Sequence, residues 1–415
     1  MKKYLIIGSG VAGVCAAESI RKLDPDGQIT IYNAESFPFY FRAAMAFYIK
    51  GAISEEELYA KPASWAKDLR IDVLGEKAVR VNTGCKEVLC QSGRMDKYGS
   101  LLIATGAWPF KAPWPGADLE GVVTYRSINC ARKTIELVKK ENVKKAVIVG
   151  GGILGVEFVE DLHNLGVQTT LLIRGDKVLE LLFDQEGGRL IQRQMEADGV
   201  RVAFGSELSE ITGENGRATG IVTKSGEKLT AGLVGIAIGA KPHIEFLEES
   251  GIETDRGVIV DGQLKTNVDD VYAAGDVAVR KAGAKFVPCR TWLTAASQGR
   301  AAGANMTGAG ADFEEKVFFN ASHAYKSIYA VVGAFNAPRE DGYEHIRIET
   351  GKDAYNKIII KEGRVAGGIF IGDIRLAWDV YRAIEKEAQV DAKVLSSNAS
   401  HNIARAMIGG PPLLF

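Results

Sequence analysis

The strongest constraint on this chain is a glycine-rich motif that occurs twice, each time between a predicted strand and a predicted helix. The first copy is Gly8-Ser9-Gly10-Val11-Ala12-Gly13, after an apolar run at 4–7, and the second is Gly150-Gly151-Gly152-Ile153-Leu154-Gly155, after an apolar run at 146–149. One such motif is weak evidence, because glycine-rich turns are common. Two copies in the same context predict two nucleotide-binding sites and suggest electron transfer between them.

The three glycines of such a motif have separate physical roles. The first allows a tight turn, and the second lets the backbone approach a pyrophosphate without a Cβ in the way. The third lets the helix pack closely on the strand, so that the N-terminus of the helix directs its free N–H groups and its dipole at the phosphates.

A carboxylate stands at the distance expected for ribose binding in the first copy. The predicted strand at 28–32 ends near Glu35, about twenty residues beyond the third glycine, where an acidic side chain accepts a hydrogen bond from an adenine ribose hydroxyl. An isolated Glu would more often be a solvated loop charge. The spacing favours ribose binding for Glu35.

Composition excludes several classes of protein. The 415 residues predict two or three domains, and 46% hydrophobic with 25% charged residues is ordinary for a soluble chain. The net charge of −1 gives no reason to expect nucleic acid or an anionic membrane as partner. The apolar run at 231–240 is about half the length of a membrane span. The 5 cysteines form no Cys-x-x-Cys pair, so we expect no metal or iron–sulfur site in the chain, and a reducing cytoplasm suits it.

The remaining pattern alternates strands and helices. We expect strands at 73–90, 101–106, 169–173, 357–360 and 365–371, a proline-rich linker at 109–115, a mixed helical stretch at 54–69, and helices at 127–142, 190–198, 291–306 and 376–386.

Four motifs in order give the chain a family resemblance. They are the first glycine loop with Glu35, the segment Ala104-Thr105-Gly106, the second glycine loop with Glu157, and Ala273-Ala274-Gly275-Asp276. The sequence resembles FAD-dependent pyridine-nucleotide oxidoreductases, a group that includes glutathione reductase, ferredoxin and rubredoxin reductases and NADH oxidases. The end of the chain looks most like rubredoxin reductases and the flavoprotein part of nitrite reductases.

The resemblance implies an α/β fold with two Rossmann-like nucleotide-binding domains. The NAD(P)H domain (113–244) would be inserted into the FAD domain (1–112 and 245–316), and an α+β C-terminal interface domain (317–415) would follow. By the same resemblance, the implied FAD-binding residues are Gly8, Gly10, Gly13, Glu35, Arg42, Thr105, Gly106, Arg126, Gly275 and Asp276. The implied NAD(P)H-binding residues are Gly150, Gly152, Gly155 and Arg174.

A thiol that many relatives carry beside the flavin is absent from the matching position. When the cysteine-containing turn of disulfide reductases and peroxidases is aligned with residues 42–51, the cysteine position is Ala43, and the peroxidase histidine becomes Val11. Alanine can neither attack a disulfide nor form a sulfenic acid, so electrons must leave the flavin directly. Ferredoxin reductases often place a lysine in this turn, where Phe47 stands here.

Two residues are candidates for the catalytic step. By resemblance, Glu157 would lie near the nicotinamide and flavin N5, although a locally paired helix carboxylate is an equal reading. Trp292 matches an aromatic residue on the nicotinamide side, with an apolar core role as the alternative. The choice of NADH or NADPH stays open: Ile173 stands where an acidic residue is expected, Arg174 suits a 2′-phosphate, and Glu180 opposes one.

The function that we expect is NAD(P)H-linked FAD electron transfer to an iron–sulfur protein, either rubredoxin, ferredoxin or the cluster subunits of a larger complex. The chain would work as a homo- or hetero-oligomer, and the apolar tail 409–415 is a candidate docking element. The alternatives are an NAD(P)H oxidase that uses dioxygen and a flavin-binding structural subunit without turnover. In the cell, hydride transfer would run in either direction between the nicotinamide and the flavin.

Overall fold

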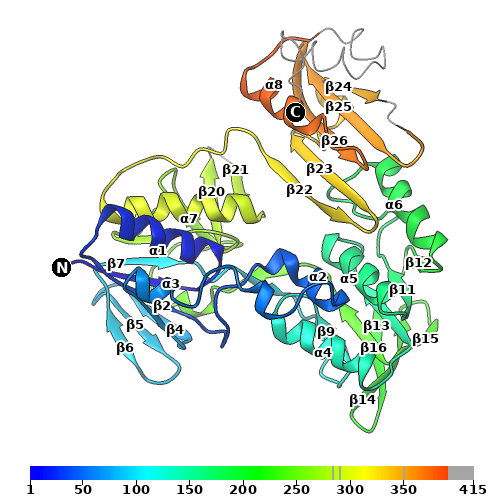
Figure 1. Ribbon diagram of the computed structural model, residues 1–415, viewed down its shortest axis with the longest axis horizontal. Helices are drawn as coiled ribbons and strands as arrows, with labels where there is room; N and C mark the ends of the chain where they lie inside the picture. Colours follow the sequence, from blue (N-terminus) through cyan, green and yellow to red (C-terminus); the bar gives the residue numbers. More distant parts are fainter. Residues whose placement is uncertain (283–284, 289–290, 349–350, 391–415) are drawn as a thin grey trace. The chain divides into compact units, whose positions relative to one another are not determined.

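The computed structural model describes residues 1–282, 285–288, 291–348 and 351–390, whose elements are shown in Figure 1. The chain divides into two compact units. The first consists of residues 1–44, 53–108 and 240–315, and the second consists of residues 45–52, 109–239 and those from 316 onward. The first unit is thus interrupted by the segment that carries the second glycine loop. Each unit contains its own parallel sheet.

The first unit is built on a parallel sheet with the strand order β19-β7-β1-β2-β3. Its strands are short apolar runs, buried because helices and loops cover both faces. The elements of this unit are β1 (Lys3–Ile7), α1 (Val11–Leu23), β2 (Gln28–Tyr32), η1 (Arg42–Ala44), η2 (Glu56–Leu58), α3 (Trp65–Asp68), β3 (Ile71–Leu74), β4 (Ala78–Asn82), β5 (Glu87–Cys90), β6 (Met95–Lys97), β7 (Ser100–Ile103), β8 (Ala107–Pro109), β17 (Ala240–Pro242), η3 (Glu245–Leu247), β18 (Val258–Val260), β19 (Val271–Ala273), β20 (Ala278–Ala282), β21 (Lys285–Pro288) and α7 (Trp292–Thr307).

Helices α1 and α7 lie side by side in the first unit (Figure 1), closer than side chains would normally allow. A Cβ on Gly299 would stand 2.2 Å from the carbonyl oxygen of Ala12, and a Cβ on Gly303 would stand 2.4 Å from that of Ala16. Only glycine permits this approach. It brings the N-terminal ends of both helices to the carboxyl edge of the sheet.

The second unit repeats the same architecture with the strand order β12-β11-β10-β16-β9. A separate antiparallel sheet, β22-β23-β26-β25-β24, is covered by α8. The elements of this unit are α2 (Met45–Lys50), β9 (Val122–Thr124), α4 (Ile128–Lys139), β10 (Lys145–Val149), α5 (Ile153–Asn164), β11 (Gln168–Leu172), α6 (Gln185–Ala197), β12 (Arg201–Ala203), β13 (Leu208–Glu214), β14 (Arg217–Thr223), β15 (Lys228–Thr230), β16 (Leu233–Ile236), β22 (Phe319–Ala324), β23 (Ser327–Gly333), η4 (Arg339–Asp341), β24 (Tyr343–Ile348), β25 (Tyr355–Lys361), β26 (Arg364–Ile371) and α8 (Ala377–Glu385).

The predicted fold class is confirmed, with two parallel sheets that carry glycine loops and a mixed C-terminal part. The expected helix at 190–198 begins earlier, at Gln185, because Asp184 caps it by accepting a hydrogen bond from the N–H of Gly187 at 3.1 Å. The helical stretch expected at 54–69 reduces to η2 and the four-residue α3, since Pro62 interrupts it. The three domain boundaries stay a prediction.

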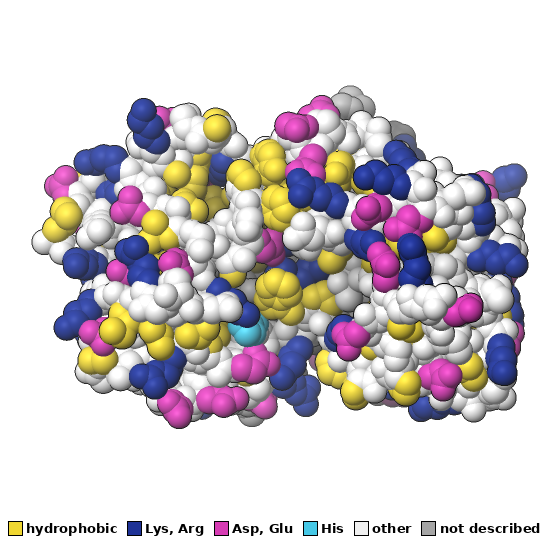
Figure 2. Space-filling model, turned by 90° about the horizontal axis from the view of Figure 1, so that it is seen from below, with side chains coloured by type: hydrophobic (Ala, Val, Ile, Leu, Met, Phe, Trp, Pro, Cys, Tyr) yellow, Lys and Arg dark blue, Asp and Glu magenta, His cyan; other side chains and the backbone are white. Residues whose placement is uncertain are grey.

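The surface and the helices place few further limits on function. No helix within the described ranges is long and apolar enough to cross a membrane. The same described residues hold no group of three or more His, Cys, Asp or Glu side chains placed to bind a metal ion. On the face shown in Figure 2, acidic and basic side chains are interspersed, which agrees with the net charge of −1.

Candidate functional site

The two glycine loops begin with the same hydrogen bond. The N–H of Gly8 donates to the carbonyl oxygen of Tyr32 at 2.9 Å, and the N–H of Gly150 donates to that of Leu172, also at 2.9 Å. Both glycines adopt a left-handed backbone, with φ of 113° and 117°. Each loop therefore leaves the central strand of its sheet through the same turn, which a side chain would strain.

The third glycine of each loop packs its helix on the turn. A Cβ on Gly13 would stand 2.0 Å from the carbonyl oxygen of Gly8, and a Cβ on Gly155 would stand 1.9 Å from that of Gly150. These distances leave no room for a side chain unless the backbone shifts. The helices α1 and α5 therefore start directly above the ends of their strands.

The middle glycine of each loop faces open space instead. A Cβ on Gly10 or on Gly152 would meet no protein atom within 4 Å. Each of these glycines is the N-cap residue of its helix, and neither cap has a side-chain hydrogen bond. The first N–H groups of α1 and α5 thus point toward a backbone-lined cradle that suits a pyrophosphate.

Glu35 belongs to a hydrogen-bonded cluster beside the first loop. Tyr40 donates its hydroxyl to Oε2 of Glu35 at 2.9 Å, and the guanidinium of Arg42 lies 2.9 Å from Oε1. Arg42 also stacks over the ring of Tyr40, with the guanidinium carbon 4.5 Å from the ring centroid. A carboxylate oxygen has a second lone pair, so Glu35 can still accept a ribose hydroxyl while Arg42 and Tyr40 fix its orientation.

The segment that follows β7, Ala104-Thr105-Gly106, packs against Gly8 of the first glycine loop. A Cβ on Gly8 would stand 2.2 Å from the carbonyl oxygen of Ala104 and 3.1 Å from the backbone nitrogen of Thr105. The hydroxyl of Thr105 donates to the carbonyl oxygen of His243 at 3.1 Å, and Gly106 turns the chain with φ of 65°. Thr105 therefore fixes this segment of the first unit as well as lying beside the cradle.

Gly275 and Asp276 follow β19 at the carboxyl edge of the sheet. The N–H of Gly275 donates to Oε1 of Gln298 on α7 at 2.9 Å. A Cβ on Gly275 would stand 3.1 Å from the Cβ of Ala12 and 3.7 Å from that of Ala295, so the turn sits where α1 and α7 meet. Asp276 is exposed just beyond this point. Gln298, whose buried amide anchors the turn, was not predicted from the sequence.

Trp292 is part of an aromatic group at the edge of the first loop. Its ring lies 5.9 Å from that of Phe39 in a stacked arrangement and 4.8 Å from that of Phe41 edge-on. A pocket beside this aromatic group brings together four of the predicted residues of the first unit, Gly10, Glu35, Arg42 and Trp292. It is lined by Ser9, Gly10, Val11, Asn33, Glu35, Phe37, Pro38, Phe39, Tyr40, Arg42 and Trp292.

Glu157 lies on α5 near a second acidic side chain and a lysine. Burial raises the pKa of Glu157 to about 8, the nearby Glu160 carboxylate adds to the increase, and Lys50 opposes it. The ammonium of Lys50 is 3.2 Å from Oε1 of Glu160. At neutral pH, Glu157 therefore holds a proton that an exposed glutamate would release.

The same helix carries a third carboxyl group, which sequence analysis missed. Asp161 is fully buried, accepts a hydrogen bond from the hydroxyl of Tyr125 at 2.7 Å, and lies 3.8 Å from the ammonium of Lys50. Its Oδ1 has no hydrogen-bond partner among the described residues. Burial raises the pKa of Asp161 well above its usual range. The sequence feature that could have pointed to Asp161 is Lys50, its ionic neighbour, which lies one helical turn after Phe47 on α2.

The end of β11 places the residues that would face the adenine ribose of a dinucleotide. Because Leu172 matches Tyr32, Gly175 takes the place that Glu35 has in the first unit. Ile173 is buried against Gly151 and cannot reach a ligand, whereas Arg174 is exposed. The carboxylate of Glu180 lies 3.0 Å from the point where a Cβ on Gly175 would stand. The carboxylate of Glu180, five residues later in the chain, therefore lies at the place that corresponds to Glu35 in the first unit.

The remaining predicted positions are located as follows. Arg126 lies in the second unit, between β9 and α4, whereas Arg42 belongs to the first. Ala43 is exposed in η1. Cys15 is buried on α1, and burial raises the pKa of its thiol, as expected for a core residue. Cys289 and the apolar tail 409–415 lie outside the described residues.

The matched loops and sheets agree with the comparison to known families. Residues 2–299 match the family described as pyridine nucleotide-disulphide oxidoreductase. The chain belongs to this family. Residues 329–388 match a second description, the C-terminal domain of rubredoxin NAD+ reductase, which covers most of the antiparallel sheet and α8.

Individual relatives extend the similarity over nearly the whole chain. Nitrite reductase [NAD(P)H] of Bacillus subtilis is 29% identical over 98% of this chain, and the chain spans 51% of that protein, about half its length. Rubredoxin-NAD(+) reductase of Pseudomonas putida is 31% identical, over 67% of this chain and 72% of that protein. The crystal structure of NADH:rubredoxin oxidoreductase from Clostridium acetobutylicum has a TM-score of 0.77 and 27% identity, and covers 94% of this chain and 96% of its own.

FAD and NAD(P)H are the cofactors of this family, and the residues present fit both. Each loop offers a cradle that any Cβ at Gly10 or Gly152 would begin to fill, at a helix N-terminus without a side-chain cap. The first loop adds the carboxylate of Glu35 and the cation of Arg42. When bound, FAD accepts a hydride and releases electrons one at a time, which no side chain of the protein can do.

Two of the three glycines of the first loop, Gly10 and Gly13, predict different effects when they are replaced by alanine. We expect Gly10→Ala to fold normally and to lose FAD affinity at least tenfold, because its Cβ enters only the open cradle. We expect Gly13→Ala to lower the free energy of unfolding by about 1–3 kcal/mol, because its Cβ meets the backbone of Gly8. Flavin absorbance per protein and urea unfolding measure the two effects. If Gly10→Ala lost as much free energy of unfolding as Gly13→Ala, the open cradle at Gly10 would be disproved.

The raised pKa of Glu157 predicts a pH-dependent stability. Above pH 4.5 the unfolded chain loses this proton, whereas the folded chain keeps it up to about pH 8. Folding therefore opposes the ionisation of Glu157. As pH rises from 4.5 to about 8, Glu157 lowers the free energy of unfolding. We expect Glu157→Gln to gain stability relative to wild type by a few kcal/mol between pH 5 and pH 8, since one pKa unit is about 1.4 kcal/mol. The control is Glu210→Gln, at an exposed position. The measurement is the free energy of unfolding as a function of pH. Parallel curves for wild type, Glu157→Gln and Glu210→Gln would disprove the prediction.

Proposed function

We propose that the protein is an FAD-dependent NAD(P)H oxidoreductase that exchanges electrons directly with an iron–sulfur protein or iron–sulfur subunits. The observation that carries the proposal is the pair of matched glycine loops in one chain, combined with alanine at position 43. Two dinucleotide sites provide a route from nicotinamide to flavin. Alanine cannot continue that route as a thiol, so the electrons leave from the flavin itself.

The residues of the chain would bind and orient the two cofactors. For FAD we propose contacts from the first loop, from the Glu35–Arg42 cluster and from the turn after β19, and for NAD(P)H contacts from the second loop and Arg174. The full proposed FAD set is Gly8, Gly10, Gly13, Glu35, Arg42, Thr105, Gly106, Arg126, Gly275 and Asp276. The NAD(P)H set is Gly150, Gly152, Gly155 and Arg174.

Two residues are proposed to act at the reacting rings. Trp292 would cover one side of the ring system, since it is held by Phe39 and Phe41 at the edge of the FAD pocket. Glu157 would hold a proton at its carboxyl group, supported by burial and by the adjacent Glu160. Lys50 would set how readily that proton is released, because its ammonium opposes the increase in pKa.

The relatives support an iron–sulfur partner. The names of two of them include rubredoxin, and a third is a nitrite reductase of which this chain spans about half. The partner of this chain would therefore be a small electron-transfer protein or the cluster-bearing part of a larger complex. We further propose a cytoplasmic location and assembly as an oligomer. The tail 409–415 remains a candidate docking element.

Direct electron exit predicts a clear kinetic pattern. Under anaerobic conditions we expect a reduced nicotinamide to bleach the flavin, and oxidised rubredoxin or ferredoxin to restore its colour. Treatment with iodoacetamide should leave both rates within about twofold, because no thiol takes part. Stopped-flow absorbance follows the flavin, and the iron–sulfur protein reports reduction independently.

The same measurement separates the alternatives. Turnover with dioxygen alone as fast as with either iron–sulfur protein would favour an oxidase. Failure of both coenzymes to bleach the flavin would favour a structural subunit. Loss of activity on alkylation would exclude the direct route.

We propose NADH as the preferred coenzyme. The support is the Glu180 carboxylate, which occupies the position beside Gly175 that corresponds to Glu35 in the FAD unit. A carboxylate accepts a hydrogen bond from a ribose 2′-hydroxyl and repels a 2′-phosphate. Arg174 beside it would then stack on the adenine rather than bind a phosphate.

A charge reversal tests this assignment. We expect Glu180→Arg to raise the ratio of kcat/KM for NADPH to that for NADH by at least tenfold, since it replaces repulsion with a phosphate contact. Steady-state reduction of an artificial electron acceptor with each coenzyme measures the ratio. Glu214→Arg, at an exposed position of β13, is the matched control. An unchanged ratio in Glu180→Arg would remove Glu180 from the coenzyme site.

A further inference from the structure

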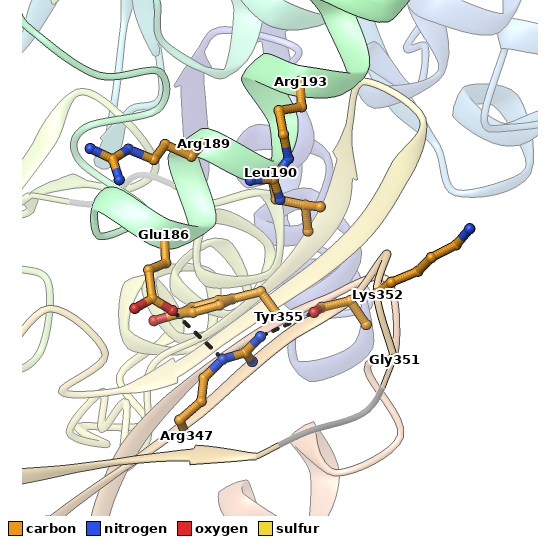
Figure 3. Close-up of a pocket in the computed structure, with 9 residues that line it drawn as sticks. Glu186, Arg189, Leu190, Arg193, Arg347, Gly351, Lys352 and Tyr355 are labelled. Carbon is orange, nitrogen blue, oxygen red and sulfur yellow. Dashed lines mark hydrogen bonds and ion pairs between the residues drawn. The ribbon is translucent and has the colours of Figure 1, made fainter.

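A hollow of about 520 Å³ lies in the second unit between helix α6 and the strands β24 and β25 (Figure 3). Four of the side chains that line it are cations and one is a carboxylate. The lining residues are Glu186, Arg189, Leu190, Arg193, Arg347, Gly351, Lys352, Ala354 and Tyr355. None of them belongs to the glycine loops, so the proposed function does not account for this hollow.

The two walls of the hollow are fixed to one another at both ends of α6. Asp184 at the start of the helix accepts hydrogen bonds from the hydroxyl of Tyr355 and, at 2.6 Å, from the ammonium of Lys357. Asp198 just past its end accepts the hydroxyl of Tyr325 at 2.7 Å and the ammonium of Lys326 at 2.6 Å. At each end of the helix, an aspartate thus accepts hydrogen bonds from one tyrosine and one lysine of the antiparallel sheet or its hairpin. The hollow is therefore preformed.

The floor of the hollow is a guanidinium that is held rigidly. Arg347 stacks over the ring of Tyr355, with the guanidinium carbon 4.2 Å from the centroid, and donates to backbone carbonyl oxygens of Ile348 and Asn356 at 3.1 and 3.0 Å. Carbonyl groups orient this cation without neutralising it. Glu186, the one carboxylate of the lining, forms an ion pair with Arg347: its Oε2 is 3.7 Å from Nε, and its side chain is 70% exposed.

The roof adds two cations that lack a counterion in the described part of the chain. Arg189 and Arg193 are exposed one helical turn apart on α6, and no described acidic side chain forms an ion pair with either. Figure 3 shows Arg193 extending from the helix toward the strands, whereas the side chain of Arg189 extends away from Arg193 and that of Lys352 extends away from the other labelled residues. Like charges four residues apart destabilise a helix, so this arrangement costs stability that a bound anion would recover.

We propose that this hollow binds a small anion with several charges, of the kind that carries phosphate groups. Guanidinium groups match phosphate oxygens through paired N–H donors, and three of the four cations here are arginines. The volume lies within the range of small-molecule sites, roughly 300–1,000 Å³, and such sites are common where two substructures meet. A concave site of this size favours a small ligand over an acidic protein surface, which would need about 1,000 Å² of buried contact in total.

Inorganic tripolyphosphate is the probe for this site. The full chain is loaded with FAD and saturated with NAD+, so that both glycine loops are occupied, and tripolyphosphate is titrated by calorimetry. We expect one saturable site whose affinity falls as KCl rises. Arg193→Gln should weaken binding at least tenfold, because Arg193 extends toward the strands across the hollow, and Lys352→Gln should weaken it less, because that side chain extends away from the other lining residues. Arg256→Gln makes the same charge change at an exposed position of the first unit and should bind like wild type.

Three outcomes would overturn the proposal. The first is the absence of saturable binding by wild type. The second is equal weakening in Arg193→Gln and Arg256→Gln, which would indicate a general charge effect. The third is unchanged tripolyphosphate binding in Arg193→Gln together with slower electron transfer to the iron–sulfur partner, which would make the hollow a protein contact instead.

Discussion

The close approach of backbone to backbone in the glycine loops is the constraint on which the rest of the site depends. A Cβ on Gly13 or Gly155 would lie within about 2 Å of a carbonyl oxygen of its own loop, so helix and strand can meet only because no side chain is present. In each unit, this contact aims the first N–H groups of the helix, α1 or α5, at the cradle of its own loop. The open space at Gly10 and Gly152 is a consequence, since the turn presents bare backbone there.

The two units share the same arrangement of strand, glycine loop and helix but differ in the side chains around it. In the first, Glu35 is oriented by Tyr40 and Arg42, and α7 adds a second helix terminus at the Gly275 turn. In the second, the corresponding position is Gly175, and an acidic group reaches it only through Glu180. We propose that the duplicated loop binds a dinucleotide in either unit, and that the surrounding residues differentiate the two sites.

Two acidic side chains of α5, the fully buried Asp161 and the partly buried Glu157, carry shifted pKa values in the second unit. Glu157 and Asp161 both have raised pKa values because burial disfavours their charged forms, while Lys50 from α2 offsets part of this cost. Lys50 lies one turn from the position where sequence comparison expects a lysine and finds Phe47. Phe47 and Lys50 are three residues apart on α2 and therefore lie on the same face of the helix.

The sequence by itself determined the two sheets, the loops, the family and the absence of a cysteine at position 43, because these follow from local spacing and from single residues. Glu35 and Arg42 were identified from spacing and resemblance, but their mutual ion pair was not. Only the tertiary structure decided which distant residues meet: Gln298 at Gly275, Tyr125 at Asp161, and the strands β24 and β25 beneath α6. These contacts join segments separated by tens to more than a hundred residues, and no periodicity within a strand or helix encodes such pairings. Burial, and with it the pKa of Glu157, likewise depends on what packs around a side chain rather than on its neighbours in the chain.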